Sequence, residues 1–208
     1  MKVSLNWIRS INEKYGCAAD PASGGIDSLI ANIGAQLGAV EEVINVGEKY
    51  KDIVIAKIVK CQKHPNADKL SICLINDGKK IEGVKRNKQG LVQVVHGAKN
   101  VRTGQLVAWI PPGVIVPSTF DKDPFILETK NLRGEISNGM IASAQELALG
   151  DNHESILIID EPARPGQALA EVYDLNDHIP SARLLRYVGR GSRDSRHPAP
   201  QIQKPKLV

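Results

Sequence analysis

A short polar stretch between two apolar runs carries side chains suited to binding a charged ligand. His64, Asn66, Asp68 and Lys69 lie within KHPNADKL (63–70). The ammonium group of Lys69 can contact a phosphate as a point charge. The amide of Asn66 can bond a base edge or a ribose hydroxyl, and it also shapes a turn. Asp68 fits a structural capping role, because its carboxylate repels phosphate.

Two further loops supply similar groups. Asn100 and Arg102 lie in HGAKNVR (96–102), and Arg133 and Ser137 follow later in the chain. A guanidinium bonds phosphates in a bidentate manner and stacks on bases, so Arg102 is the strongest single candidate for a contact. We expect these loops to converge on one rim of a β scaffold.

The spacing C-x-x-H at Cys61 and His64 invites comparison with a metal site. A structural zinc ion needs four ligands, and Cys17, Cys73 and His96 provide no second paired spacing. We therefore predict no metal ligands. The chain also lacks the G-x-S-x-G, Walker and dinucleotide-binding spacings, so we predict no catalytic residues.

The first polar stretch is expected to be the tip of a β-hairpin. Val54–Cys61 is rich in β-branched residues and reads as a strand buried on much of both faces. Pro65 cannot donate to a strand ladder, and Leu70–Ile75 then resumes an apolar alternation. The tip is expected to carry four polar residues into solvent: His64, Asn66, Asp68 and Lys69.

Other short strands follow at close spacing, with Gly and Pro between them. Leu91–Val95 and Leu106–Ile110 are strand candidates, and Asp77–Gly90 is expected to be an elongated hairpin or a mobile loop. Before the hairpin, Ser4 is a candidate N-cap and Ile26–Leu37 has helical periodicity. The pattern predicts an α+β, mainly β fold with a small barrel.

Three spaced motifs make the chain similar to the tRNA-binding module of several aminoacyl-tRNA synthetases. KHPNADKL (63–70) resembles the signature of that module, and HGAKNVR (96–102) resembles its CGAPNVR loop. LRGEISNGMIAS (132–143) resembles its LRGVESEGMLCS segment. His96 and Lys99 depart from the family pattern. The resemblance implies an oligonucleotide-binding (OB) fold, a five-stranded Greek-key barrel.

The opening MKVSLNWI looks like the start of bacterial phenylalanyl-tRNA synthetase β chains. The resemblance covers about Met1–Asp177 and implies that a small N-terminal α/β segment frames the barrel. The implied domains are the N-terminal segment (1–46), the tRNA-binding OB-fold domain (47–160), a return helix that packs with the N-terminal segment (161–180), and a basic tail whose composition suggests disorder (181–208).

The same resemblance implies which side chains meet the RNA, through its shape and backbone. The expected tRNA-binding residues are Lys63, His64, Asn66, Lys69, Lys99, Asn100, Arg102, Arg133, Ser137 and Asn138.

The implied function is tRNA binding as part of the β subunit of phenylalanine–tRNA ligase, with the α chain as partner. The complete enzyme uses ATP and magnesium at a site on the α chain. This chain is therefore expected to be a non-catalytic portion without a cofactor. One alternative is a stand-alone tRNA-binding accessory protein, although such proteins usually lack a segment like MKVSLNWI. Another is a subunit-assembly module whose barrel contacts the partner chain.

The charge is unevenly distributed. The chain has 27 Lys+Arg and 23 Asp+Glu, and residues 181–208 hold seven of the former and one of the latter. The first 180 residues are therefore slightly acidic, so any RNA-binding charge there must be local. No apolar stretch could span a membrane, and the odd cysteine count fits a reducing cytoplasm.

Overall fold

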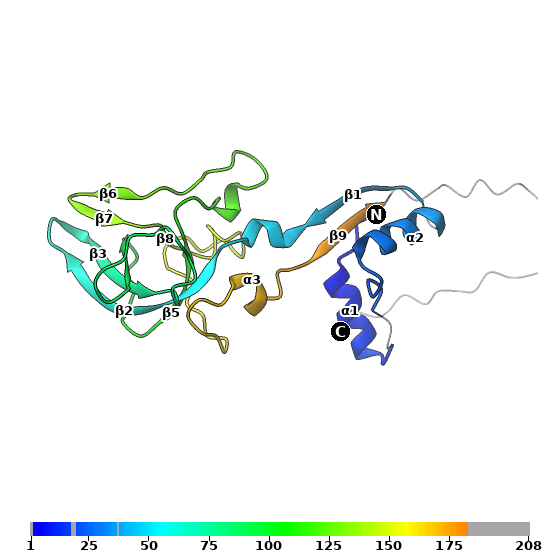
Figure 1. Cartoon of the computed structure of the whole chain (residues 1–208), viewed down its shortest axis with the longest axis horizontal. Helices are drawn as coiled ribbons and strands as arrows, with labels where there is room; N and C mark the ends of the chain where they lie inside the picture. Colours follow the sequence, from blue (N-terminus) through cyan, green and yellow to red (C-terminus); the bar gives the residue numbers. More distant parts are fainter. Residues whose placement is uncertain (1, 18–19, 37, 183–208) are drawn as a thin grey trace, which may run out of the picture.

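The computed structural model describes residues 2–17, 20–36 and 38–182. Figure 1 shows a β-sheet body and a helical unit, joined by a two-stranded ribbon. The helical unit contains α1 (Leu5–Lys14) and α2 (Ile26–Gln36). The ribbon consists of β1 (Val40–Asn45) and β9 (His178–Ala182), which pair antiparallel. The chain thus enters the β-sheet body along β1 and leaves it along β9.

The β-sheet body, residues 46–177, is built on a five-stranded antiparallel sheet of order β4-β3-β2-β5-β8. Its strands are β2 (Val54–His64), β3 (Ala67–Asn76), β4 (Val92–His96), β5 (Leu106–Ile110) and β8 (Met140–Ile141). A separate hairpin joins β6 (Lys130–Leu132) to β7 (Glu135–Ser137). Three short helices complete the body: η1 (Val46–Tyr50), η2 (Pro117–Thr119) and α3 (Leu169–Val172). The predicted mainly β, antiparallel architecture is confirmed at this level, and it is OB-like.

Strand β2 lies between two apolar clusters. Val54, Ala56 and Ile58 belong to one cluster, which also contains the fully buried Trp109. Ile53 and Ile55 belong to the other. The predicted burial on both faces is confirmed for the first part of β2, whereas Val59, in its second part, is 43% exposed. Strand β2 and its partner β3 form the framework for the polar loops.

The helical unit is only lightly packed. The Ser4 hydroxyl accepts a hydrogen bond from Trp7 N (3.0 Å), as expected of an N-cap. Leu5 is buried, but α2 contains no buried residue. Trp7 is 60% exposed. Within the described residues, no helix has both the length and the apolar character needed to cross a membrane.

The segment after residue 160 contacts both parts of the molecule. Leu169 of α3 is fully buried in the body, and its backbone N–H donates to Ile53 O (3.0 Å). The element of this segment that pairs with β1 is the strand β9, not a helix; the pairing extends from His178 to Ala182. The basic tail expected from residue 181 therefore begins with two residues of β9, and its remainder lies outside the described residues.

The connection between β3 and β4 is a folded loop organised around Asp77. This fully buried carboxylate forms two hydrogen bonds with Arg86, Nη1–Oδ1 at 2.5 Å and Nη2–Oδ2 at 2.9 Å. It also accepts from the backbone N–H groups of Lys79 and Ile81. Burial alone would raise the pKa of Asp77, but the Arg86 guanidinium and the backbone donors outweigh it and hold that pKa below its usual value. Strand-type pairing in the described loop is limited to an isolated bridge between Arg86 and Val92, so the loop is not an elongated hairpin.

Candidate nucleic-acid interface

The imidazole of His64 points into the protein. His64 is only 4% exposed, so the expectation that the hairpin tip carries this side chain into solvent is wrong. Its Nε2 lies 3.0 Å from Leu132 O, and its Nδ1 accepts from Asn66 N (3.0 Å). The ring thus fixes the tip of the β2–β3 hairpin against the β6–β7 hairpin.

The two hairpin tips also meet through Asn66 and Arg133. Asn66 Nδ2 donates to Arg133 O (3.3 Å), and Arg133 Nη1 lies 3.5 Å from Asn66 O. Arg133 itself has a positive φ of 54°, and Gly134 follows with 99°, which makes a tight left-handed turn. Both Asn66 and Arg133 remain exposed. The structure therefore brings together two residues that lie far apart in the sequence but were both predicted for the site.

The loop 96–102 lies next to the β2–β3 hairpin, because His96 pairs with Ser71. The Asn100 side chain is used internally: it donates to Ile156 O (3.1 Å) and accepts from Ile156 N (3.0 Å). Arg102 is exposed, and its Nη1 donates to Lys99 O and Val101 O at 2.7 and 2.8 Å. Asn100 thus anchors the loop, while Arg102 lies on its surface.

His96, a departure from the family motif, is mostly enclosed. Burial lowers its pKa, although the nearby Glu146 carboxylate acts in the opposite direction. The ring is therefore neutral at neutral pH and adds no positive charge to the loop.

Ser137 and Asn138 are each 4% exposed. The Ser137 hydroxyl accepts from Val95 N and donates to Gly139 O, both at 3.0 Å. Asn138 Nδ2 donates to Gln93 O (3.1 Å), and Asn138 O accepts from the Trp109 indole N–H (3.0 Å). In this structure both side chains hold the end of β7 against β4 and the core.

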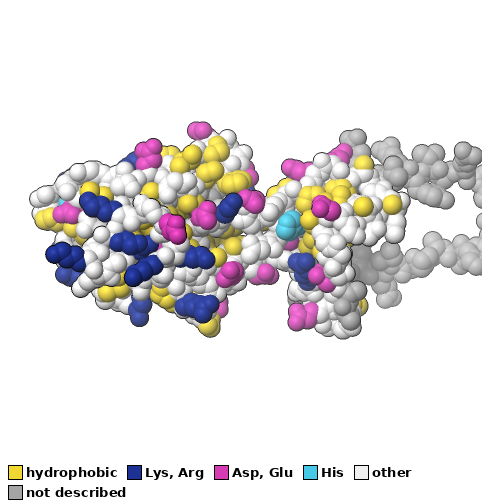
Figure 2. Space-filling model, in the orientation of Figure 1, with side chains coloured by type: hydrophobic (Ala, Val, Ile, Leu, Met, Phe, Trp, Pro, Cys, Tyr) yellow, Lys and Arg dark blue, Asp and Glu magenta, His cyan; other side chains and the backbone are white. Residues whose placement is uncertain are grey.

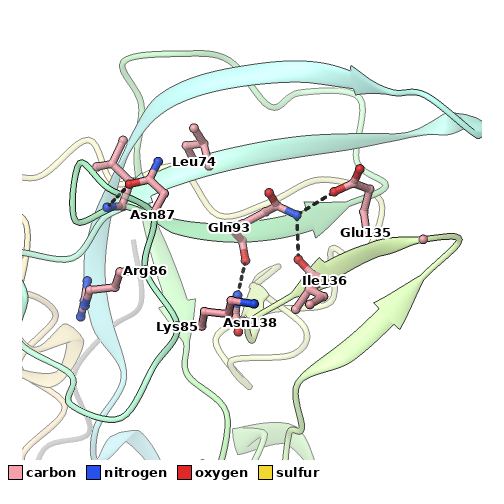
Figure 3. Close-up of a pocket in the computed structure, with 10 residues that line it drawn as sticks. Leu74, Lys85, Arg86, Asn87, Gln93, Glu135, Ile136 and Asn138 are labelled. Carbon is pink, nitrogen blue, oxygen red and sulfur yellow. Dashed lines mark hydrogen bonds between the residues drawn. The ribbon is translucent and has the colours of Figure 1, made fainter.

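A groove lies beside these contacts (Figure 3). It has a volume of about 260 Å³ and runs between the loop 77–91 and the β6–β7 hairpin, over the outer faces of β3 and β4. Its apolar lining comes from Leu74, Leu91 and Ile136. Its polar lining comes from Lys85, Arg86, Asn87, Gln93, Glu135 and Asn138.

The polar groups of the groove hold one another in place. Gln93 Nε2 donates to Glu135 Oε2 (2.9 Å) and to Ile136 O (3.1 Å), as Figure 3 shows. The Arg86 guanidinium is engaged by Asp77. Lys85 is exposed at the edge of the groove. An apolar floor with fixed amides and one exposed ammonium suits a flat, hydrogen-bonding ring that carries a phosphate.

A second cavity of about 290 Å³ extends this groove under the same loop. It shares Lys85, Ile136 and Asn138 with the first, and adds Pro112 and Thr129. The two cavities are therefore adjacent and share part of their lining with the β6–β7 hairpin.

The β-sheet body carries the exposed cations among the predicted site residues. Figure 2 shows Lys and Arg side chains concentrated on the β-sheet body, with few on the visible face of the helical unit. Among the described residues, no ion pair engages the exposed predicted cations or Lys85. These exposed residues are Lys63, Lys69, Lys85, Lys99, Arg102 and Arg133. The β-sheet body therefore presents exposed cations without an ion-pair partner, although the first 180 residues are slightly acidic overall.

Lys85, Gln93 and Ile136 were not among the predicted site residues. Ile136 lies within the third motif (132–143) but was not chosen from it, Gln93 lies on β4, and Lys85 lies in the connection between β3 and β4, outside all three motifs. The available signal was the Lys-rich composition of that connection, DGKKIEGVKRNKQG.

The C-x-x-H residues do not face a common point. Cys61 Sγ lies 3.6 Å from Cys73 Sγ, whereas the His64 ring bonds the β6–β7 hairpin. No group of three or more His, Cys, Asp or Glu side chains able to hold a metal ion occurs within the described residues.

Known proteins provide an independent comparison. Residues 53–168, more than half of the chain, match the family model described as "Putative tRNA binding domain". Similar curated proteins are named "Phenylalanine--tRNA ligase beta subunit". That of Xanthomonas oryzae pv. oryzae is 37% identical over 178 residues, covering 85% of this chain and 19% of the relative. That of Chlorobaculum tepidum is 32% identical over 172 residues, covering 82% and 19%. The chain thus spans about a fifth of the length of these relatives.

Proposed function

This chain belongs to the putative tRNA binding domain family, with homology to phenylalanine–tRNA ligase β subunits, and we propose that its groove and the neighbouring loops form the tRNA-binding surface. The observation that carries the proposal is the groove between the loop 77–91 and the β6–β7 hairpin. Its apolar floor can receive an unstacked base, its amides can bond base edges, and Lys85 can meet the phosphate.

The predicted contact residues divide into two groups under this proposal. The exposed group contacts RNA: Lys63, Asn66, Lys69, Lys99, Arg102 and Arg133. The enclosed or internally bonded group positions the loops: His64, Asn100, Ser137 and Asn138. RNA contacts by phosphate-binding cations and loop amides predict affinity that falls with added salt.

We also propose that the sheet closes into the Greek-key barrel of an OB fold. Support comes from a contact near the two edge strands of the sheet, β4 and β8. Asn138, two residues before β8, donates from its backbone N–H to Gln93 O of β4 (2.9 Å). In OB folds this closed arrangement presents a strand face and adjacent loops to oligonucleotides, and the groove lies over such a face.

The wider setting follows from the relatives. We propose the domain division 1–46, 47–160, 161–180 and 181–208, a cytoplasmic location, and a role within a phenylalanine–tRNA ligase that includes an α chain. ATP and magnesium would serve the complete enzyme. No aminoacylation by this chain alone is expected.

The test is a titration of tRNA with the full chain near physiological salt, in which fluorescence anisotropy reports binding. The double substitution Lys85→Ala/Arg133→Ala is expected to weaken affinity about tenfold or more, since each contact of this kind contributes about 1 kcal/mol. Lys14→Ala, on α1, serves as the matched control because it removes an exposed lysine from the helical unit. Equal losses in both proteins would contradict a site in the groove.

A second function, subunit assembly, is favoured by the helical unit. Trp7 is 60% exposed, Tyr15 is 71% exposed, and α2 has no buried residue. We propose that these exposed side chains belong to a contact surface for another protein chain. Substituting Trp7→Ser tests this role: it would weaken association with an α chain without changing tRNA affinity.

A further inference from the structure

Two cysteines face each other across the β2–β3 hairpin. Cys61 and Cys73 are direct partners in the antiparallel register, and their Sγ atoms lie 3.6 Å apart. Directly opposed residues in antiparallel strands have Cα atoms roughly 4.5–5.5 Å apart. A disulfide accepts Cα separations of roughly 4.4–6.8 Å. The two sulfur atoms can therefore bond through side-chain rotation, with the strands kept in place.

The two thiols differ in access. Cys61 is half-buried, whereas Cys73 is fully buried in the apolar cluster that includes Ile75 and Val94. Burial raises the pKa of the Cys73 thiol. A reagent in solution thus reaches Cys61 first, and Cys73 can react only with a sulfur that is already beside it.

The surroundings of Cys61 favour an anionic reagent. Lys63 lies two residues further along β2, on the same face as Cys61, and Lys60 directly precedes Cys61 on the opposite face; both lysines are exposed. Neither forms an ion pair in the part of the chain that the structure describes. Their charges attract a small anion to the half-buried thiol.

We propose that Cys61 and Cys73 form a dithiol–disulfide pair that a small anionic disulfide, such as oxidised glutathione, oxidises by thiol–disulfide exchange. The Cys61 thiolate attacks one sulfur of the reagent, whose S–S bond breaks. A mixed disulfide forms on Cys61 and one small thiolate leaves. The Cys73 thiolate then attacks the Cys61 sulfur, which forms the Cys61–Cys73 bond and releases the second small thiolate.

This sequence balances without a further reactant. Two protein thiols are oxidised and one small disulfide is reduced to two small thiols. The two protons given up by the cysteines are taken up by the two released thiolates. The product links β2 and β3 three residues before His64, so the same hairpin that carries the candidate tRNA interface would be cross-linked.

The experiment uses the full chain with Cys17→Ser, because Cys17 is exposed and would react independently. The folded protein is incubated with oxidised glutathione, quenched with acid, and examined by intact mass and by thiol count in denaturant. The expected product has lost both thiols, is lighter by two hydrogens, and carries no glutathione. Unreacted thiols, a lasting adduct or a dimer linked by disulfides would overturn the proposal.

Two matched variants check the order of the steps. With Cys73→Ser added, the reaction is expected to stop at a glutathione adduct on Cys61. With Cys61→Ser added, Cys73 is expected to stay reduced while the protein is folded. Rapid modification of Cys73 in that folded variant would contradict the assigned order.

A comparison with the unfolded chain shows whether the fold itself promotes the disulfide, or whether the short sequence separation of the two cysteines is sufficient. Folding that holds the thiols together should favour the disulfide at equilibrium by about tenfold or more. The measured quantity is the ratio of the squared concentration of reduced glutathione to the concentration of oxidised glutathione at half-oxidation, because each exchange releases two reduced molecules. The same ratio in buffer and in urea would overturn the proposal, because the fold would then contribute nothing to the pairing.

Discussion

The imidazole of His64 couples two hairpins that are distant in sequence. It lies within hydrogen-bond distance of Leu132 O and accepts from Asn66 N, and it is almost fully buried. His64→Ala removes both partners and is expected to lower the free energy of unfolding by about 1–3 kcal/mol. Urea denaturation measures this loss, with His153→Ala as an exposed histidine control. Equal stability of the His64 variant and the wild type would show that these bonds contribute nothing net.

Arg102 remains the strongest single contact candidate at the level of one side chain. It is exposed, and its Nη1 donates to two carbonyls of its own loop, which presents the guanidinium in a defined place. Arg102→Ala is expected to weaken tRNA affinity by about 1–2 kcal/mol, in the range of charge-assisted hydrogen bonds. The measurement is a tRNA titration, accompanied by the melting temperature. An unchanged affinity would remove the loop 96–102 from the interface.

At the scale of elements, the loop 77–91 depends on a buried ion pair. Asp77 is fully buried, and it engages Arg86 with two hydrogen bonds. Asp77→Asn leaves the Arg86 charge without its carboxylate and is expected to destabilise the fold by about 3–5 kcal/mol. The same change should loosen one wall of the groove, because Lys85 and Asn87 flank Arg86.

The pH dependence of this effect has a definite sign. The pKa of Asp77 lies below its usual value in the folded protein, and an unfolded aspartate titrates near about 3.9. Its stabilising contribution is therefore complete above about pH 4–5 and is lost as the pH falls through the folded pKa. The difference in unfolding free energy between wild type and Asp77→Asn should be constant from neutral pH to about pH 5 and shrink in stronger acid. Urea denaturation across this range measures it, and a difference that grows in acid would contradict the assignment.

Local sequence patterns account for some elements better than others. The β2–β3 hairpin follows from apolar alternation broken at Pro65, and α1 follows from the Ser4 cap. Strand β9 is different, because HIPSA contains a proline and has no alternation of its own. It is a strand because it pairs with β1, more than a hundred residues earlier. The burial of His64 was likewise invisible locally, since its partner carbonyl belongs to Leu132.

For the molecule as a whole, the sequence could identify the loops of the candidate site but not their assembly. The motifs pointed to Asn66 and Arg133 separately, and the structure joins them. Ser137 and Asn138 belong to a motif as well, yet both are buried at the end of β7. A motif indicates that its residues serve one site. It does not distinguish a side chain that touches a ligand from one that supports the loop.

The distribution of charge gives a last prediction about the whole chain. Residues 183–208 hold seven Lys and Arg and one acidic residue. In the β-sheet body, the exposed Lys85 lines the groove, and the exposed Arg133 directly precedes the lining residue Gly134. A variant that ends at Ala182 keeps β9 complete and removes the tail charges. Both proteins are titrated with tRNA over a range of salt concentrations. For every tail cation that contacts a phosphate, the shortened protein should lose about 0.9 from the magnitude of the slope of log K against log salt, if duplex RNA behaves as duplex DNA does.

The dependence on Lys85 and Arg133 then separates the two sources of affinity. If the body carries the site, the shortened protein still binds tRNA, and Lys85→Ala/Arg133→Ala weakens that binding by the same factor as in the full chain. If the tail supplies the affinity, the shortened protein loses binding and the double substitution has no further effect. The second outcome would leave the groove without a role in RNA binding and favour subunit assembly, because a slightly acidic body without its tail has little general attraction for a polyanion.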